Sequence, residues 1–164
     1  MPQGFFSPME KALNTMNEHL FGPLQGGDAI GEYASKFRHS DSLPLEISAP
    51  LDLFPSLPRP SGIMPQCSWV DSWPFHDRAG VYMIYSEAGE LMYIGKTSMN
   101  QCIGKRLYVR FGGDESCVIK DDWWPQPPRF VVIVAVPDTQ RFEAPALEEF
   151  LIKRLQPICN VAGK

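Results

Sequence analysis

The sequence is poor in the residues that build metal centres from histidine and cysteine. It has only three histidines and four cysteines in 164 residues, and no two cysteines form a CxxC pair. None of the histidines has the spacing of metal ligands. These absences argue against a zinc site, and they indicate free thiols in a reducing compartment.

Long apolar runs are also absent. No stretch approaches the length that spans a bilayer, and the first residues lack the basic start and apolar core of a secretory signal. The composition, 44% hydrophobic and 21% charged, is typical of soluble globular proteins. We therefore expect a cytoplasmic protein with no membrane partner, with one well-cored domain and an extension.

Positive charge is scarce overall, because the formal net charge is −4. An acidic balance opposes nucleic-acid binding, but the field at a site depends on local charge. Residues 79–164 carry ten basic and ten acidic side chains, so the acidic excess lies in residues 1–78. Residues 91–113 contain no acid and four cations, Lys96, Lys105, Arg106 and Arg110. This distribution predicts a compact cationic patch on the second half.

Residues 1–78 read as an N-terminal helical and proline-rich extension. A capping box and an apolar stripe predict a helix over residues 8–20, and a second short helix should begin after Asp28. Seven prolines in residues 39–74 exclude regular helix or central strand, yet this segment is too apolar for a disordered linker. We expect an arm packed on the domain. The expected contacts are Leu13, Phe37, Phe54 and Trp69.

The stretch GVYMIYSEAGELMYIGK, residues 80–96, predicts a β-hairpin with a turn glycine. A loop of even length pairs Tyr82 with Gly95, and it places Tyr82 and Tyr93 on one face of the sheet. A one-residue bulge at Gly89 would instead place the two tyrosines on opposite faces, since side chains alternate with period two.

Three further elements complete the predicted domain over residues 79–164. Apolar residues at i, i+4 and i+8 predict a helix over residues 103–111. A β-branched run predicts a buried strand over 129–136, and a final helix should run from about 145 to 155. The expected fold class is α+β, with a small three-stranded, mainly antiparallel sheet flanked by helices.

The final helix carries adjacent glutamates that face different surroundings. Glu149 points away from the apolar stripe and can pair with Lys153 at i+4. Glu148 lies at the edge of the stripe, where a carboxylate is partly desolvated and requires a cation or hydrogen-bond donors.

Five elements stand in a fixed order: GVY at 80–82, YIG at 93–95, Arg106, Glu148 and Asn160. This order resembles the GIY-YIG nuclease family over about residues 79–161, with Val81 in place of the family's isoleucine. The segment KRLYVRF resembles the family's pattern of arginine, leucine and a later aromatic, which favours Arg106 over Arg110 as the functional arginine.

The resemblance implies a metal-dependent endonuclease that hydrolyses DNA phosphodiesters. Glu148 would bind Mg²⁺ or Mn²⁺, and Arg106 would contact the phosphate. Tyr82 is the candidate to activate water, with Tyr93 beside it, and Gly95 would leave room for the phosphate backbone. Five residues are expected to bind substrate: Gly95, Lys96, Lys105, Arg110 and Asn160.

Two alternatives stay open at this point. One is a catalytically silent DNA-binding module of the same fold. The other is a protein-interaction module that uses the proline-rich arm and the loop at Trp123 and Trp124. The sequence leaves open whether the substrate is single- or double-stranded, and double-strand cutting would favour a homodimer.

Overall fold

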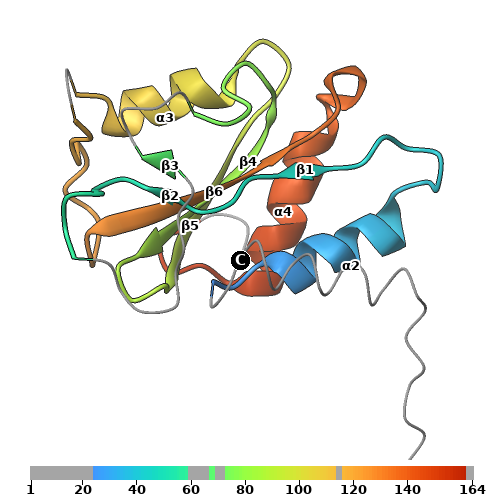
Figure 1. Ribbon diagram of the computed structural model, residues 1–164. Coiled ribbons are helices and arrows are strands. Elements are labelled where there is room, and N and C mark those ends of the chain that lie inside the picture. The colour runs from blue at the N-terminus through green and yellow to red at the C-terminus, as the bar shows by residue number, and fades with distance from the viewer. Residues whose placement is uncertain (1–23, 59–66, 69–72, 114–115, 162–164) are drawn as a thin grey trace, which may run out of the picture.

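The computed structural model describes residues 24–58, 67–68, 73–113 and 116–161 (Figure 1). The helix predicted over residues 8–20 lies outside the described residues, as do Leu13 and Trp69. No helix within the described ranges is long and apolar enough to cross a bilayer.

The centre of the sheet consists of three antiparallel strands, β4 (Gly80–Ser86), β5 (Leu91–Thr97) and β6 (Pro128–Ala135). These are the three strands that the sequence predicts, and the α+β class is confirmed. The N-terminal arm adds three strands of two residues each. They are β1 (Glu46–Ile47), β2 (Leu51–Asp52) and β3 (Cys67–Ser68). The sheet therefore has six strands in the order β3-β2-β6-β4-β5, with β1 also paired to β6.

Helices cover the two faces of the sheet unequally. Helix α3 (Ile103–Phe111) lies on one face, whereas α2 (Gly27–Phe37) and α4 (Glu143–Leu155) lie on the other (Figure 1). Helix α4 begins two residues before the predicted start, because Pro145 fits within the first turn, where its missing N–H costs no hydrogen bond. A single 3₁₀ turn, Asp138–Gln140, precedes α4.

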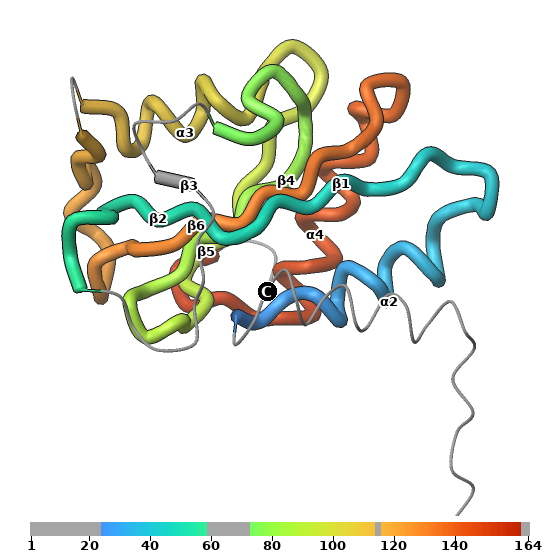
Figure 2. The backbone as a smooth tube through the Cα atoms, in the orientation of Figure 1, coloured from blue at the N-terminus to red at the C-terminus, as the bar shows by residue number. Residues whose placement is uncertain are grey.

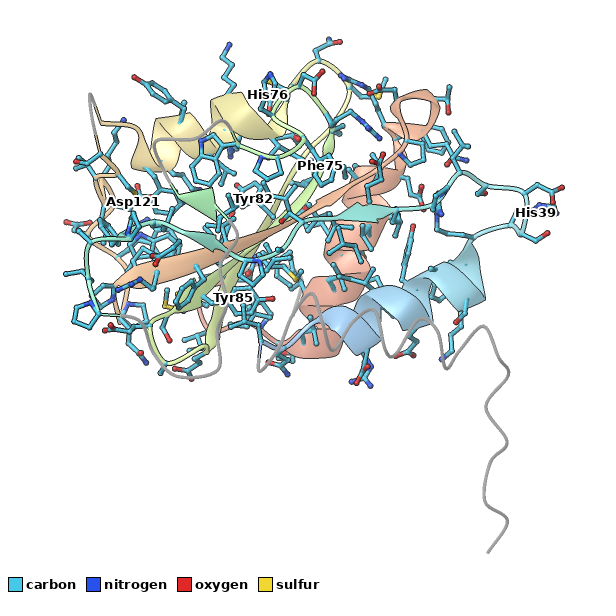
Figure 3. All side chains as sticks on the ribbon, viewed as in Figure 1. His39, Phe75, His76, Tyr82, Tyr85 and Asp121 are labelled. Atoms are coloured by element: carbon cyan, nitrogen blue, oxygen red, sulfur yellow. The ribbon has the colours of Figure 1, made fainter. Side chains whose placement is uncertain are left out.

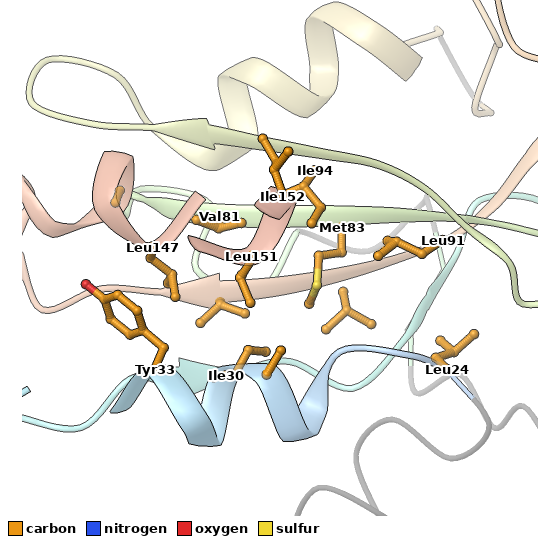
Figure 4. Close-up of a cluster of buried hydrophobic side chains, with 14 of the residues drawn as sticks. Leu24, Ile30, Tyr33, Val81, Met83, Leu91, Ile94, Leu147, Leu151 and Ile152 are labelled. Atoms are coloured by element: carbon orange, nitrogen blue, oxygen red, sulfur yellow. The ribbon is translucent and has the colours of Figure 1, made fainter. Parts of the chain in front are cut away.

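Each face has its own apolar core. On the α2/α4 face, Val81 and Met83 of β4 pack with residues of both helices (Figure 4). On the α3 face, Ile84 packs with Ile103 and Leu107, both wholly buried as the helical spacing predicts. Figure 2 shows the segment of β1 and β2 running alongside β6, so that the arm extends the sheet.

The motif tyrosines pair as the loop of even length predicts, but the turn itself is odd, with five residues between the paired Tyr85 and Leu91. Tyr82 lies opposite Gly95, and Ile84 lies opposite Tyr93. A register shift does occur, but between Ile84 and Tyr85, next to the turn. Since the shift is beyond both motifs, Tyr82 and Tyr93 keep the same face.

A buried ion pair joins the arm to the central sheet. The Arg129 guanidinium donates to both carboxylate oxygens of Asp52, at 2.7 and 3.0 Å, and both side chains are almost wholly buried. Phe54 packs against the core of the α3 face, as expected. Phe37 is 63% exposed but contacts the ring of Phe150 on α4. The arm thus packs on the sheet in its described part, and the domain boundary at residue 78 stays a prediction.

Candidate active site

The two motif tyrosines lie together on the α3 face. Their ring centroids are 6.2 Å apart. Tyr82 is wholly buried, whereas Tyr93 is half-buried and lines a cavity. Figure 3 shows Tyr82 on the side of α3 and Tyr85 on the opposite side of the sheet. Tyr93 is therefore the tyrosine that a bound molecule meets first.

Gly95 makes room for Tyr82. A methyl group on Gly95 would lie 2.3 Å from the Tyr82 hydroxyl oxygen and 2.4 Å from its ring carbon Cζ. We expected this glycine to leave space for a phosphate backbone, but the space is filled by the phenol itself. The correct reason for the glycine is the close packing of the Tyr82 ring across the strand pair.

The two arginines of α3 have different surroundings. Arg106 is exposed, while the Arg110 guanidinium lies 4.6 Å from the centroid of the Tyr93 ring and 3.1 Å from an Asp121 carboxylate oxygen. Burial by itself lowers the pKa of Arg110, but Tyr82, Tyr93 and Asp121 favour the charged form, and the net shift is upward. The arginine held against the tyrosines is thus Arg110.

Glu148 occupies the half-buried position that its place on the helix predicts. Desolvation raises the pKa of this carboxyl, and the charges of Lys96 and Arg106 act in the opposite direction. The charge of Arg106 therefore lowers the pKa of Glu148, although Arg110 is the arginine that lies over the Tyr93 ring. Glu149 is exposed, and no ion pair joins it to Lys153 in the described structure.

Desolvation also raises the pKa of Tyr93, and the nearby Tyr82 adds to this effect. The charges of Arg110 and Arg106 oppose the shift, and that of Glu148 supports it. Tyr93 thus keeps its proton and is suited to donate a hydrogen bond.

A cavity of about 1000 Å³ brings Tyr93, Arg110 and Glu148 to one surface, whereas Arg106 and Lys96 are outside its lining. It is bounded by β5, α3, the loop before β6, α4 and the segment after α4. The side chains that matter for charge and stacking are Tyr93, Arg110, Trp123, Glu148 and Glu149. Tyr82 lies behind Tyr93, outside the lining.

Asn160 lies along the free edge of β5. Its side-chain oxygen accepts from the Ile94 N–H and its side-chain nitrogen donates to the Ile94 carbonyl, each at 2.8 Å. The neighbouring Cys159 N–H donates to the Met92 carbonyl at 2.7 Å. Both groups of the amide are therefore engaged with the strand, which fixes the segment after α4.

The sequence model of the GIY-YIG catalytic domain matches residues 78–160, just over half of the chain. The chain belongs to the GIY-YIG family. No curated protein and no solved structure gives a significant match. The matched range contains both tyrosines, both α3 arginines, Glu148 and Asn160, and membership points to nucleases as the general class.

Family membership implies a divalent metal, and Glu148 is the carboxylate suited to it. No group of three or more His, Cys, Asp or Glu side chains gathers among the described residues. Mg²⁺, however, is commonly bound by one or two carboxylates together with substrate phosphates and water. The half-buried Glu148, in a cavity open to a substrate, fits a metal that the substrate helps to hold.

Three polar atoms of the GIY-YIG site are buried without a hydrogen bond in the described structure, and one of them is Arg110 Nε. Among the described residues, neither the Tyr82 hydroxyl nor the Trp124 indole N–H has a hydrogen bond. Sequence reasoning missed the packing of Trp124 and Trp123 against Tyr93, and the WW pair in a proline-rich loop was the available signal. It also missed Asp121, for which no pattern in the sequence exists.

Proposed function

We propose that this GIY-YIG protein is a divalent-metal-dependent DNA endonuclease. The observation that carries the proposal is the buried Tyr82 hydroxyl, which makes no hydrogen bond among the described residues and interacts electrostatically with Arg110. It lies behind Tyr93, which lines a cavity together with Arg110 and Glu148. A buried hydroxyl without a partner costs about 1–3 kcal/mol. A water molecule that satisfies it would be the nucleophile that hydrolysis requires.

Tyr82 is the proposed proton acceptor. A charged guanidinium stabilises a phenolate at close range, and Arg110 lies beside both tyrosines. Tyr93, which retains its proton, would donate a hydrogen bond to a phosphate oxygen or to the water. In its phenolate form, the Tyr82 oxygen would accept a proton from the attacking water as the water oxygen bonds to phosphorus. The bond from phosphorus to the leaving sugar oxygen would break in the same step, and that oxygen would take a proton from solvent water.

The α3 arginines have separate proposed roles. Arg110 forms an ion pair with Asp121 and lies over the Tyr93 ring, so its role is to orient the two tyrosines and to stabilise negative charge on them. No ion pair holds Arg106 in the described part of the chain. Arg106 is therefore available for the phosphate, where a planar guanidinium stabilises the charge that builds up in the transition state.

Glu148 is the proposed metal ligand. A bound Mg²⁺ or Mn²⁺ would act as a Lewis acid on the phosphate and leaving oxygens. The carboxylate is partly desolvated, and Lys96 and Arg106 act on it without forming an ion pair with it in the described structure, which favours a divalent ion beside it. Lys96 and Lys105 would contact flanking phosphates, while Asn160, engaged by Ile94, would position β5.

The matched pair Glu148→Gln and Glu149→Gln tests this proposal with supercoiled plasmid and Mg²⁺. Glu148→Gln removes one charge at constant size and should abolish cleavage while DNA binding stays equal or tightens, since affinity comes mainly from cations at phosphates. Glu149→Gln removes a charge from the same cavity lining, but from an exposed side chain that is not the proposed metal ligand, so it should cleave like the wild type. Undiminished cleavage by Glu148→Gln would overturn the assignment, and wild type that binds but never cuts would be the silent module.

A further inference from the structure

Three aromatic rings form a column that leads from the core to the cavity. Phe111, wholly buried on α3, stacks with Trp124 at 6.5 Å between centroids. Trp124 stacks with Trp123 at 4.0 Å and 26° between planes. Trp123, the outer ring, is 44% exposed and lines the same cavity as Glu148. The column therefore presents an aromatic surface beside the candidate catalytic carboxylate.

Contacts on the side of the column hold the outer ring in place. Tyr93 meets Trp123 and Trp124 edge to face, at 5.8 and 6.1 Å. The Arg110 guanidinium lies 5.6 Å from the Trp123 ring and is itself held by Asp121. An exposed indole with this much support loses little conformational entropy when a ligand stacks on it.

We propose that Trp123 is a stacking platform for an unpaired nucleobase of the DNA substrate. The inference rests on the proposed nuclease function and names its substrate class, DNA with a single-stranded stretch at the cut site. A paired base inside a duplex has both faces covered by its neighbours, so only an unpaired or extruded base can stack on a protein side chain. A cavity of about 1000 Å³ leaves space for a nucleotide between Trp123 and Glu148.

The cavity lining beside the platform carries the carboxylates of Glu148 and Glu149 and the cation of Arg110, and further cations lie next to it, which suits a nucleic acid bound together with a metal ion. Lys96 and Arg106 are near enough to act on Glu148, and neither forms an ion pair within the described ranges. The carboxylate of Asp121 is already balanced by Arg110 at 3.1 Å. Cations that follow the backbone and a ring that accepts any base are the two parts of sites for single-stranded nucleic acid.

The test measures binding in the Glu148→Gln background, which separates it from cleavage. Fluorescence anisotropy compares two labelled duplexes with a short single-stranded tail, one of thymidines and one of abasic residues that keep the phosphates. The thymidine tail should bind about 5- to 100-fold more tightly, the range for stacking of one base on one ring. Trp123→Leu should abolish the difference, and Trp123→Phe should retain part of it.

The control is Phe142→Leu, which changes an aromatic side chain that is 67% exposed and outside the cavity lining. It should leave the preference for thymidine unchanged. Equal affinity for both tails would overturn the proposed stacking on Trp123, even if the wild type cuts plasmid. The exposed Trp123 surface would then be a candidate contact for a protein partner. If Trp123→Leu fails to fold, the comparison of tails in Glu148→Gln decides alone. Preference for thymidine without any cleavage would overturn only the nuclease proposal.

Discussion

The two faces of the sheet differ in whether their buried tyrosine hydroxyls are hydrogen-bonded. On the α2/α4 face, the hydroxyl of Tyr85 donates to the Gln25 carbonyl at 2.6 Å, and burial raises the pKa of this phenol. On the α3 face, the hydroxyl of Tyr82 has no partner among the described residues. Both phenols are wholly buried and come from the same strand. Only one of them is satisfied.

The contrast extends beyond the two tyrosines. Six buried side-chain atoms lack a hydrogen bond in the described structure. Two of them, in Arg78 and Arg129, lie 3.5 Å from a carboxylate oxygen, so charge compensates them. The other four belong to the α3 side of the sheet: Tyr82, Thr97, Arg110 and Trp124. Unsatisfied groups are few in folded proteins, and their concentration on the side of the sheet where Arg110 lines the cavity indicates a face built for a ligand.

Tyr82→Phe gives the largest expected effect on this comparison. Removal of the proposed proton acceptor should slow plasmid cleavage about 10²- to 10⁴-fold. Stability should stay equal or rise, since the variant removes a buried hydroxyl that lacks a partner. Cleavage rates and urea unfolding curves measure the two effects. Full activity in Tyr82→Phe would remove this phenol from the mechanism.

Gly95→Ala tests the same phenol through its packing. The added methyl would overlap the Tyr82 hydroxyl and ring, and overpacking of a core costs about 1–3 kcal/mol. Since the ring must move, cleavage should fall as well. Gly80→Ala is the matched control, because its methyl would lie 2.1 Å from the Val134 carbonyl, which is backbone and cannot yield. We expect Gly80→Ala to destabilise more, and Gly95→Ala to lose more activity per kcal/mol of stability lost, as unfolding and cleavage assays would show.

The elements that could be predicted from sequence depend on local patterns. The period-two alternation of residues 80–96 indicated which positions share a face, whereas the register depends on an odd turn together with the shift between Ile84 and Tyr85, which no pattern in the sequence reports. The i, i+4 and i+8 spacing in residues 103–111 gave both bounds of α3. The strands of the arm could not be found this way, because each has two residues and pairs with partners distant in sequence.

Four residues that the sequence proposed for the site, Tyr93, Arg110, Glu148 and Asn160, line the cavity, but their contacts could not be predicted. Arg106 and Arg110 are one turn apart on α3, and only the position of Asp121 in a later loop decides which guanidinium is held against Tyr93. The engagement of Asn160 by Ile94 depends on how the segment after α4 meets the edge of β5. Such contacts join segments far apart in sequence, and no periodicity reports them.

Tyr85→Phe tests the same comparison on the α2/α4 face, where the buried phenol has a hydrogen-bond partner. The variant removes the hydrogen bond to Gln25 and leaves a carbonyl without its donor, which should cost about 0.5–1.5 kcal/mol. Cleavage should be unchanged, because Tyr85 is wholly buried and is outside the cavity lining. Urea unfolding beside Tyr82→Phe measures the difference in sign between the two phenols. A loss of stability in Tyr82→Phe equal to that in Tyr85→Phe would contradict the idea that only one face carries an unsatisfied phenol.

Glu148→Gln should give the smallest effect, a dependence of stability on pH. Desolvation raises the pKa of Glu148 in the folded state, so the protonated form is favoured there, and the stability it contributes at low pH is lost as pH rises through the folded pKa. At neutral pH the charged carboxylate therefore destabilises the folded state, and Glu148→Gln should melt at a slightly higher temperature than the wild type. The difference in melting temperature should disappear as pH falls below the ordinary carboxyl pKa of 4.5.

Added Mg²⁺ should raise the melting temperature of the wild type and not that of Glu148→Gln, because only a ligand that binds the folded state stabilises it. Glu149→Gln, whose carboxylate is exposed, should follow the wild type throughout. A difference in melting temperature between Glu148→Gln and wild type that stays constant from acid to neutral pH would show that the carboxylate lacks the desolvation that favours metal binding.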